Sequence, residues 1–202
     1  NALTGLSQHT GNWAGKTVDN AMGTFTYKDC LCTAVDLPGT YSLLSPNADE
    51  RITEAYISSG EADITALVAD ATCLLRNISL ILQLQQLTEN IIVCVNLMDE
   101  ARKKKIHINT HLLSQLLHTP VIPMSARAKD GIEALKECIC AFDLTREASD
   151  DRERQCAGND VRDFVAQAGE IYKQCVTVEA SDPHALDRKL DRIVTSRLFG
   201  IP

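Results

Sequence analysis

Three apolar runs of strand length alternate with segments of helical periodicity, and this alternation constrains the fold more than any other feature of the chain. The runs are ADITALVADAT (62–72), NIIVCVNLMD (90–99) and PVIPMSA (120–126). The helical patterns after them are LLRNISLILQLQQLTE (74–89), interpreted as an amphipathic helix, NTHLLSQLLH (109–118) and GIEALKECICAF (131–142). Such alternation with short connections predicts an α/β fold, with a mostly parallel sheet and helices on both faces. The run 62–72 is expected to be a strand buried on both faces.

Two further β-rich runs precede this pattern. GTFTYKD (23–29) and CLCTAVDL (30–37) meet at the polar pair Lys28-Asp29, which predicts a hairpin. A loop rich in Pro, Gly and Ser follows, and ADERITEAYISSG (48–60) then predicts a helix that ends at Gly60. We assign residues 1–142 to one α/β domain.

The composition changes after Phe142. The segment 143–160 is charged and has no strand pattern, whereas 161–178 and 182–201 both have helical periodicity. Residues 143–202 are therefore predicted to form a small, all-helical C-terminal subdomain.

The bulk properties exclude several classes of protein. A net charge of −7 argues against nucleic-acid binding, which needs a basic face. The sequence shows no apolar run long enough to cross a bilayer and no signal peptide, so we expect a soluble chain in the cytosol with reduced thiols among its eight cysteines. Cys30 and Cys32 share one strand face, and a thiolate metal site there is the less favoured alternative.

The segment GNWAGKTVDN (11–20) contains a Gly-Lys-Thr that is reminiscent of a phosphate-binding loop. That loop requires four residues between its glycines, but only three separate Gly11 from Gly15. It must also follow a buried strand, whereas the preceding residues are polar and few. Lys16 therefore does not mark a phosphate loop.

Three short motifs each follow a predicted strand, so we expect them at one edge of the sheet, where ligands bind in such folds. Asp36-Leu37-Pro38-Gly39 suits a γ-phosphate sensor, because the carboxylate can hold a magnesium-bound water and the glycine N–H can contact phosphate. Asn96-Leu97-Met98-Asp99 can read guanine, whose N1–H and exocyclic amine are donors to one carboxylate. After Ser125, the N–H of Ala126 can donate to guanine O6. Each motif alone is weak, but their order and positions together are specific.

With these motifs the chain resembles the guanine-nucleotide-binding family and, within it, the cytosolic N-terminal region of FeoB-type ferrous iron transporters. The resemblance is carried by NALTGLSQHTGNWAGKTV (1–18), VDLPGTYSL (35–43), ADATCLLRNISLILQL (69–84), VNLMDEARKK (95–104) and LDRIVTSRLFGIP (190–202). It implies a P-loop-NTPase-like, small-GTPase-like fold that binds GTP or GDP with Mg²⁺, with K⁺ as a candidate further cation.

The resemblance also implies the role of each site residue. Thr17, in a first switch loop over 8–18, would bind Mg²⁺ and the γ-phosphate, and Asp36 would also act on Mg²⁺. Gly39 and Thr40 would lie near the γ-phosphate in the second switch; no residue is assigned as a certain catalytic group. Asn96, Asp99, Ser125 and Ala126 would read the base.

The sequence departs from this family pattern in three places. Leu97 replaces the lysine that most guanine-nucleotide-binding proteins carry, as is common among the transporters that the chain resembles, and this implies weaker contacts with the base. Thr40 stands where Ras-like proteins have the water-orienting glutamine, which implies slow hydrolysis. The family's first strand and true phosphate loop would precede Asn1. Without them we expect poor nucleotide binding and a sheet in which two strands lack their shared neighbour.

The leading hypothesis is a slowly hydrolysing GTP-dependent regulatory domain at the cytoplasmic face of the bacterial inner membrane. Its expected partners are guanine nucleotide, the transporter's own membrane domain and small cytosolic accessory proteins of iron uptake, but not nucleic acid. Two alternatives remain open. They are a non-hydrolysing nucleotide-sensing or docking module, and a soluble GTPase of the ribosome-assembly or tRNA-modification type.

Overall fold

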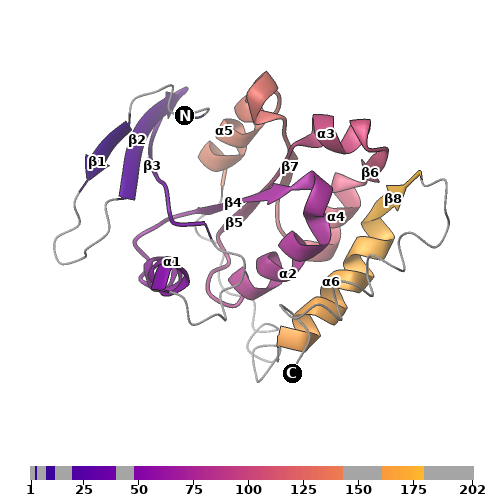
Figure 1. The fold of residues 1–202 in the computed structure, drawn as a ribbon. Helices are drawn as coiled ribbons and strands as arrows, with labels where there is room; N and C mark the ends of the chain where they lie inside the picture. The colour runs from indigo at the N-terminus through magenta and orange to yellow at the C-terminus, as the bar shows by residue number, and fades with distance from the viewer. Residues whose placement is uncertain (1–2, 4–7, 12–19, 40–47, 143–160, 180–202) are drawn as a thin grey trace.

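The computed structural model describes residues 3, 8–11, 20–39, 48–142 and 161–179 (Figure 1). Its strands are β1 (Gln8–Gly11), β2 (Asn20–Tyr27), β3 (Cys30–Val35), β4 (Thr65–Asp70), β5 (Ile91–Asn96), β6 (Ile106–Ile108), β7 (Val121–Pro123) and β8 (Val176–Val178). Its helices are α1 (Ala48–Ser58), α2 (Leu74–Leu84), α3 (Met98–Lys103), α4 (Thr110–Leu117), α5 (Ile132–Cys140) and α6 (Val161–Cys175), with 3₁₀ turns at Ala71–Cys73 and Ala126–Ala128.

The central sheet is parallel, as the sequence predicted. Its strand order is β4-β5-β7, and β5 pairs in parallel with both neighbours. In the register between β4 and β5, Asp70 lies opposite Asn96, so both strands end at the same edge. The helices lie on both sides of this sheet (Figure 1), which confirms the predicted α/β architecture with flanking helices.

Alternation along β5 separates the interior into two clusters. Ile91, Val93 and Val95 point toward the cluster that includes the side chains of α2, α4 and α6. Ile92 and Cys94 point to the other face and pack with residues of α5. Because side chains alternate between the faces of a strand, this continuous apolar run is buried on both sides.

β4 differs from the prediction that its run would be buried on both faces. Val68 is 65% exposed, while Ala69 is fully buried. The side chains of α5 pack with Ile92 and Cys94 of β5 and with Ile122 of β7, and this cluster does not include Val68. Among the described strands, β3 pairs only with β2 and β4 only with β5.

The predicted hairpin is confirmed and is extended by one strand. β2 and β3 pair antiparallel around the Lys28-Asp29 turn, where Lys28 has a φ of 52°. β1 pairs antiparallel with β2 on the other side. Residues 8–11, expected as the start of a switch loop, therefore form a strand in this structure.

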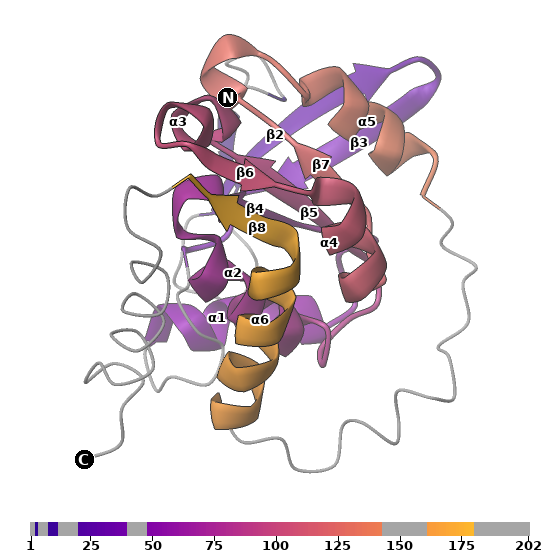
Figure 2. The same ribbon diagram turned by 90° about the vertical axis from the view of Figure 1, so that its right-hand side faces the viewer.

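Residues 161–179 pack directly on the α/β domain. Figure 2 shows α6 alongside α2 and α4, and β8 pairs antiparallel with β6. The sequence predicted helical structure over 161–178 in an all-helical subdomain, and this is wrong for residues 176–178, which form β8 after the helix α6 ends at Cys175. The sequence also did not predict β6 or the short α3. It also treated α2 as amphipathic, whereas nine of its side chains are buried because α6 covers the side that faces away from the sheet.

No described helix is long and apolar enough to cross a membrane. The division of the chain at residue 142 into an α/β domain and a helical subdomain remains a proposal.

Candidate functional site

Asn96 joins the two loops expected to read a base. It is the last residue of β5, and its Oδ1 accepts a hydrogen bond of 3.0 Å from the N–H of Ala126. Met98 N–H donates to the carbonyl oxygen of Met124 at 3.1 Å, which ties the same two loops a second time. The sequence placed these segments at neighbouring strand ends, and the structure brings them into contact.

The contact between Asn96 and Ala126 bears on how a base would bind. We expected the Ala126 N–H to donate to guanine O6, but here it donates to the Asn96 side chain. A guanine O6 at this position must share or replace that bond. Asn96 therefore acts in this structure as a positioning residue for the Ser125-Ala126 turn.

Asp99 lies at the start of α3 and is held by Ser125. Its N–H donates to the Ser125 Oγ at 3.2 Å, and the Ser125 side chain is buried. Partial desolvation would raise the pKa of Asp99, but the Ser125 hydroxyl and the N–H groups of Asp99 and Glu100 stabilise the charged form and hold the pKa below its usual value. The carboxylate is thus ionised at neutral pH, as the recognition of two donors on one base requires.

Leu97, the residue between these groups, adopts an unusual backbone conformation. It is the residue before α3, has a φ of 63° and is 36% exposed. A left-handed conformation costs an ordinary residue about 1–2 kcal/mol, so its neighbours must hold it in place. The apolar side chain is left partly accessible close to Asp99 in the sequence.

The turn after Ser125 is closed by residues that the sequence analysis missed. Ser125 and Asp130 exchange backbone hydrogen bonds of 3.1 and 3.2 Å. Gly131 follows with a φ of 81°, and a Cβ at that position would lie 2.4 Å from the Pro123 carbonyl oxygen. The Asp-Gly pair at 130–131 is a turn signal that could have identified this closure.

The Asp36-to-Gly39 motif lies in the loop after β3 and is anchored to α1. Thr53, which is buried, donates its hydroxyl hydrogen to the Pro38 carbonyl oxygen at 3.2 Å. Leu37 packs against the main core, whereas Asp36 and Gly39 are exposed. Among the described residues, no hydrogen bond or ion pair joins this motif to the residues expected to read the base, which contact one another through the Asn96–Ala126 and Asp99–Ser125 hydrogen bonds.

The other expected switch residues lie outside the described part of the chain. Thr17, assigned to Mg²⁺ and the γ-phosphate, and Thr40, next to Gly39, both belong to segments without a description here. The Mg²⁺ ligand pair Thr17 and Asp36 is therefore a proposal that rests on the sequence.

Comparisons with known proteins agree on one family. The family model described as ferrous iron transport protein B matches residues 1–139. The Fe(2+) transporter FeoB of Salmonella typhimurium is 46% identical, and that of Escherichia coli strain K12 47% identical, each over 143 residues. These alignments cover 69% of this chain and 18% of each relative, so the chain spans less than a fifth of their length.

Solved structures of FeoB cytosolic domains and G domains are also similar to this chain. The cytosolic domain of the T. maritima FeoB iron transporter in its GDP form II has a TM-score of 0.75 at 24% identity, over 87% of this chain and 92% of that chain. The G domain of the T. maritima transporter has a TM-score of 0.63 at 38% identity, over 69% and 85%. The FeoB G domain of Methanococcus jannaschii has a TM-score of 0.60 at 38% identity, over 69% and 83%.

Proposed function

The chain belongs to the ferrous iron transport protein B family, and on this premise we propose that it is a guanine-nucleotide switch that binds GTP and GDP and hydrolyses GTP slowly. The observation that supports this most directly is the link between the two base-reading loops. The Asn96 side chain holds the Ala126 turn, and Ser125 holds Asp99. The Asp99 carboxylate would accept the two donors of guanine, and the Ala126 N–H would donate to its O6 once it shares or leaves its bond to Asn96.

The direct test exchanges the hydrogen-bonding character of Asp99. Asp99→Asn replaces a pure acceptor with a group that can both accept and donate. Xanthine carries a carbonyl oxygen where guanine carries its amine, so the variant should lose GTP and gain xanthosine triphosphate. We expect a shift in preference of at least about 30-fold, since one mismatch is created for GTP and one is removed for xanthosine triphosphate, each worth about 1–3 kcal/mol.

The experiment is a competition assay on the complete natural protein. Glu100→Gln is the matched control because it removes one negative charge from the adjacent position, and it should leave the preference for GTP unchanged. Equal competition by ATP and GTP in the unmodified protein, or an Asp99→Asn variant that still prefers GTP, would refute the assignment of the base site.

Slow hydrolysis is the part of the proposal that depends on Thr40. Position 40 has no glutamine side chain to orient the attacking water, so the backbone of the switch or a bound cation such as K⁺ must place it. Thr17 and Asp36 would hold the Mg²⁺ ion. The presence of Thr40 in place of a glutamine also favours the second candidate function, a nucleotide-sensing module without hydrolysis. Single-turnover release of phosphate above the buffer blank separates the two, because a pure binding module releases none.

We further propose that the nucleotide state is transmitted to an iron-transporting membrane domain of the same protein, with accessory cytosolic proteins as additional partners. The switch segments 8–18 and 39–48 would change order with the nucleotide, and α6 would relay the change. Support comes from the packing of α6 on α2 and from the family, whose curated relatives are named as Fe(2+) transporters. The family assignment favours this over a soluble GTPase of ribosome assembly or tRNA modification.

A further inference from the structure

Three cysteine thiols from two distant parts of the sequence meet beside the hairpin of β2 and β3. Cys30 and Cys32 lie on β3, with their sulfur atoms 3.5 Å apart, and Cys140 is the last residue of α5. The three sulfur atoms lie within 4.8 Å of one another, and no other group of three potential metal ligands occurs among the described residues. All three cysteines are free thiols. We propose that they form a three-thiolate site for a zinc-like divalent metal ion.

The spacing of the sulfur atoms fits this coordination. Zinc binds thiolates at about 2.3 Å in tetrahedral geometry, which places two bound sulfur atoms about 3.8 Å apart. The observed separations of 3.5 Å to at most 4.8 Å bracket that value, so small rotations of the side chains suffice. Three protein ligands leave a fourth position for water, and all three side chains are partly exposed, so an ion can enter from solution.

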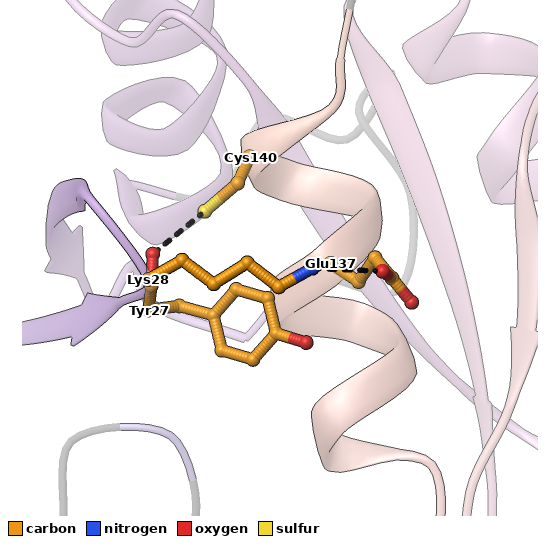
Figure 3. Close-up of polar contacts among 4 residues, drawn as sticks. All are labelled: Tyr27, Lys28, Glu137 and Cys140. Atoms are coloured by element: carbon orange, nitrogen blue, oxygen red, sulfur yellow. Dashed lines mark hydrogen bonds and ion pairs between the residues drawn. The ribbon is translucent and has the colours of Figure 1, made fainter.

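The backbone around the thiols is already held in place by other contacts. Lys28 Nζ lies 3.1 Å from Glu137 Oε1, and the Cys140 thiol donates weakly to the Tyr27 carbonyl oxygen at 3.9 Å (Figure 3). These contacts join the hairpin turn to the end of α5, so a metal ion need not bring the two elements together. This lowers the entropic cost of assembling the site.

The charges and protons balance without an oxidant. Each thiol loses one proton when it binds the ion, so one divalent ion and three thiols give a complex with a net charge of −1 and three released protons. The Lys28 ammonium group, which is also paired with Glu137, lies close enough to act electrostatically on Cys140 and favours its charged form.

The donor set also decides which metals fit. Thiolates favour Zn²⁺ over Fe²⁺ in the general order of affinity and do not suit Mg²⁺, which prefers oxygen ligands. The proposed site is therefore separate from the Mg²⁺ expected beside a nucleotide, and it does not depend on the proposed function. A bound ion would fasten the β2–β3 hairpin to α5.

The test uses Co²⁺ as a spectroscopic probe on the reduced 202-residue chain. We expect one Co²⁺ per chain, with a sulfur-to-cobalt charge-transfer band in the near ultraviolet and release of the Co²⁺ by Zn²⁺. Loss of a supporting residue around a metal costs about 10–100-fold in affinity, and loss of a ligand should cost at least as much, so Cys32→Ser and Cys140→Ser should weaken binding by at least that factor. Cys138→Ser and Cys73→Ser, which alter thiols outside the cluster, should bind as the unmodified chain does.

Circular dichroism shows whether each variant is folded. If Cys140→Ser does not fold, the Cys140→Ala variant is used in its place. The proposal is overturned if the unmodified chain gives no charge-transfer band with excess Co²⁺. It is equally overturned if folded Cys32→Ser and Cys140→Ser variants retain the affinity of the unmodified chain, because other cysteines would then hold the ion.

Discussion

Replacing Gly131 with alanine tests the closure of the turn that carries Ser125 and Ala126. Gly131 has a φ of 81°, and an added Cβ would lie 2.4 Å from the Pro123 carbonyl oxygen and 2.9 Å from Met124 Cγ. The left-handed backbone alone costs an alanine about 1–2 kcal/mol. A contact of 2.4 Å with a backbone oxygen forces the chain to shift, and such overpacking costs about 1–3 kcal/mol more. We therefore expect Gly131→Ala to lower the free energy of unfolding by about 2–5 kcal/mol.

Two other glycines separate these contributions. Gly60 has a φ of 70° with nothing within 4 Å of an added Cβ, so Gly60→Ala should show only the backbone cost of about 1–2 kcal/mol. Gly169 lies within α6, also with open space and no positive φ, and Gly169→Ala should stabilise the protein by about 0.5–1 kcal/mol through higher helix propensity.

The assay is urea unfolding of the three variants and the unmodified chain, followed by far-ultraviolet circular dichroism. From most to least stable, we expect the Gly169→Ala variant, the unmodified chain, Gly60→Ala and Gly131→Ala. A Gly131→Ala variant that loses no more than Gly60→Ala would refute the close approach of Gly131 to Pro123 on which the reasoning depends.

Three further predictions concern single side chains. The pKa of Asp99 is lowered in the folded state, so its charged form stabilises the fold at pH values above the ordinary pKa of 3.8. In urea titrations, the unmodified chain should therefore be more stable than Asp99→Asn from neutral pH down to about pH 4. This difference should disappear as the pH falls further. Burial and, to a smaller extent, the nearby Cys138 raise the pKa of Cys94 to about 12. At neutral pH a thiol reagent should therefore label the exposed Cys73 rapidly but Cys94 only when the protein unfolds, which mass spectrometry can follow. Thr53→Val should lower the free energy of unfolding by about 1 kcal/mol in denaturant titrations, because the Pro38 carbonyl oxygen loses its hydrogen-bond donor.

The sequence was sufficient to predict the features that repeat locally. Apolar runs and helical periodicity predicted β2 to β5, β7 and the helices α1, α2, α4 and α5, because each depends on residues close together in the chain, whereas β1, α3 and β6 were not predicted. Asn96, Asp99 and Ser125, the residues expected to read the base, were also predicted to meet, since parallel strands end at one edge of a sheet.

Features that depend on distant contacts were not predictable in this way. The strand β8 contains three residues and resembles the end of α6; it becomes a strand only because β6 lies beside it. Val68 was expected to be buried, but its burial depends on which helix covers β4 and not on its own apolar run. The approach of Cys140 to Cys30 and Cys32 likewise results from the packing of α5 on the hairpin, which no local pattern encodes.

The shared packing of α2 and α6 determines how any signal can leave the α/β domain. Phe164 and Ile171 of α6 belong to the same buried cluster as Ile78 and Ile81 of α2. Separating the helices would expose side chains whose burial is worth about 1.5–3 kcal/mol each, so α6 cannot swing away as a freely hinged arm. We expect the two helices to move as a sliding pair, with small changes in tilt or register conveying the state of the sheet edge to the C-terminal part of the chain.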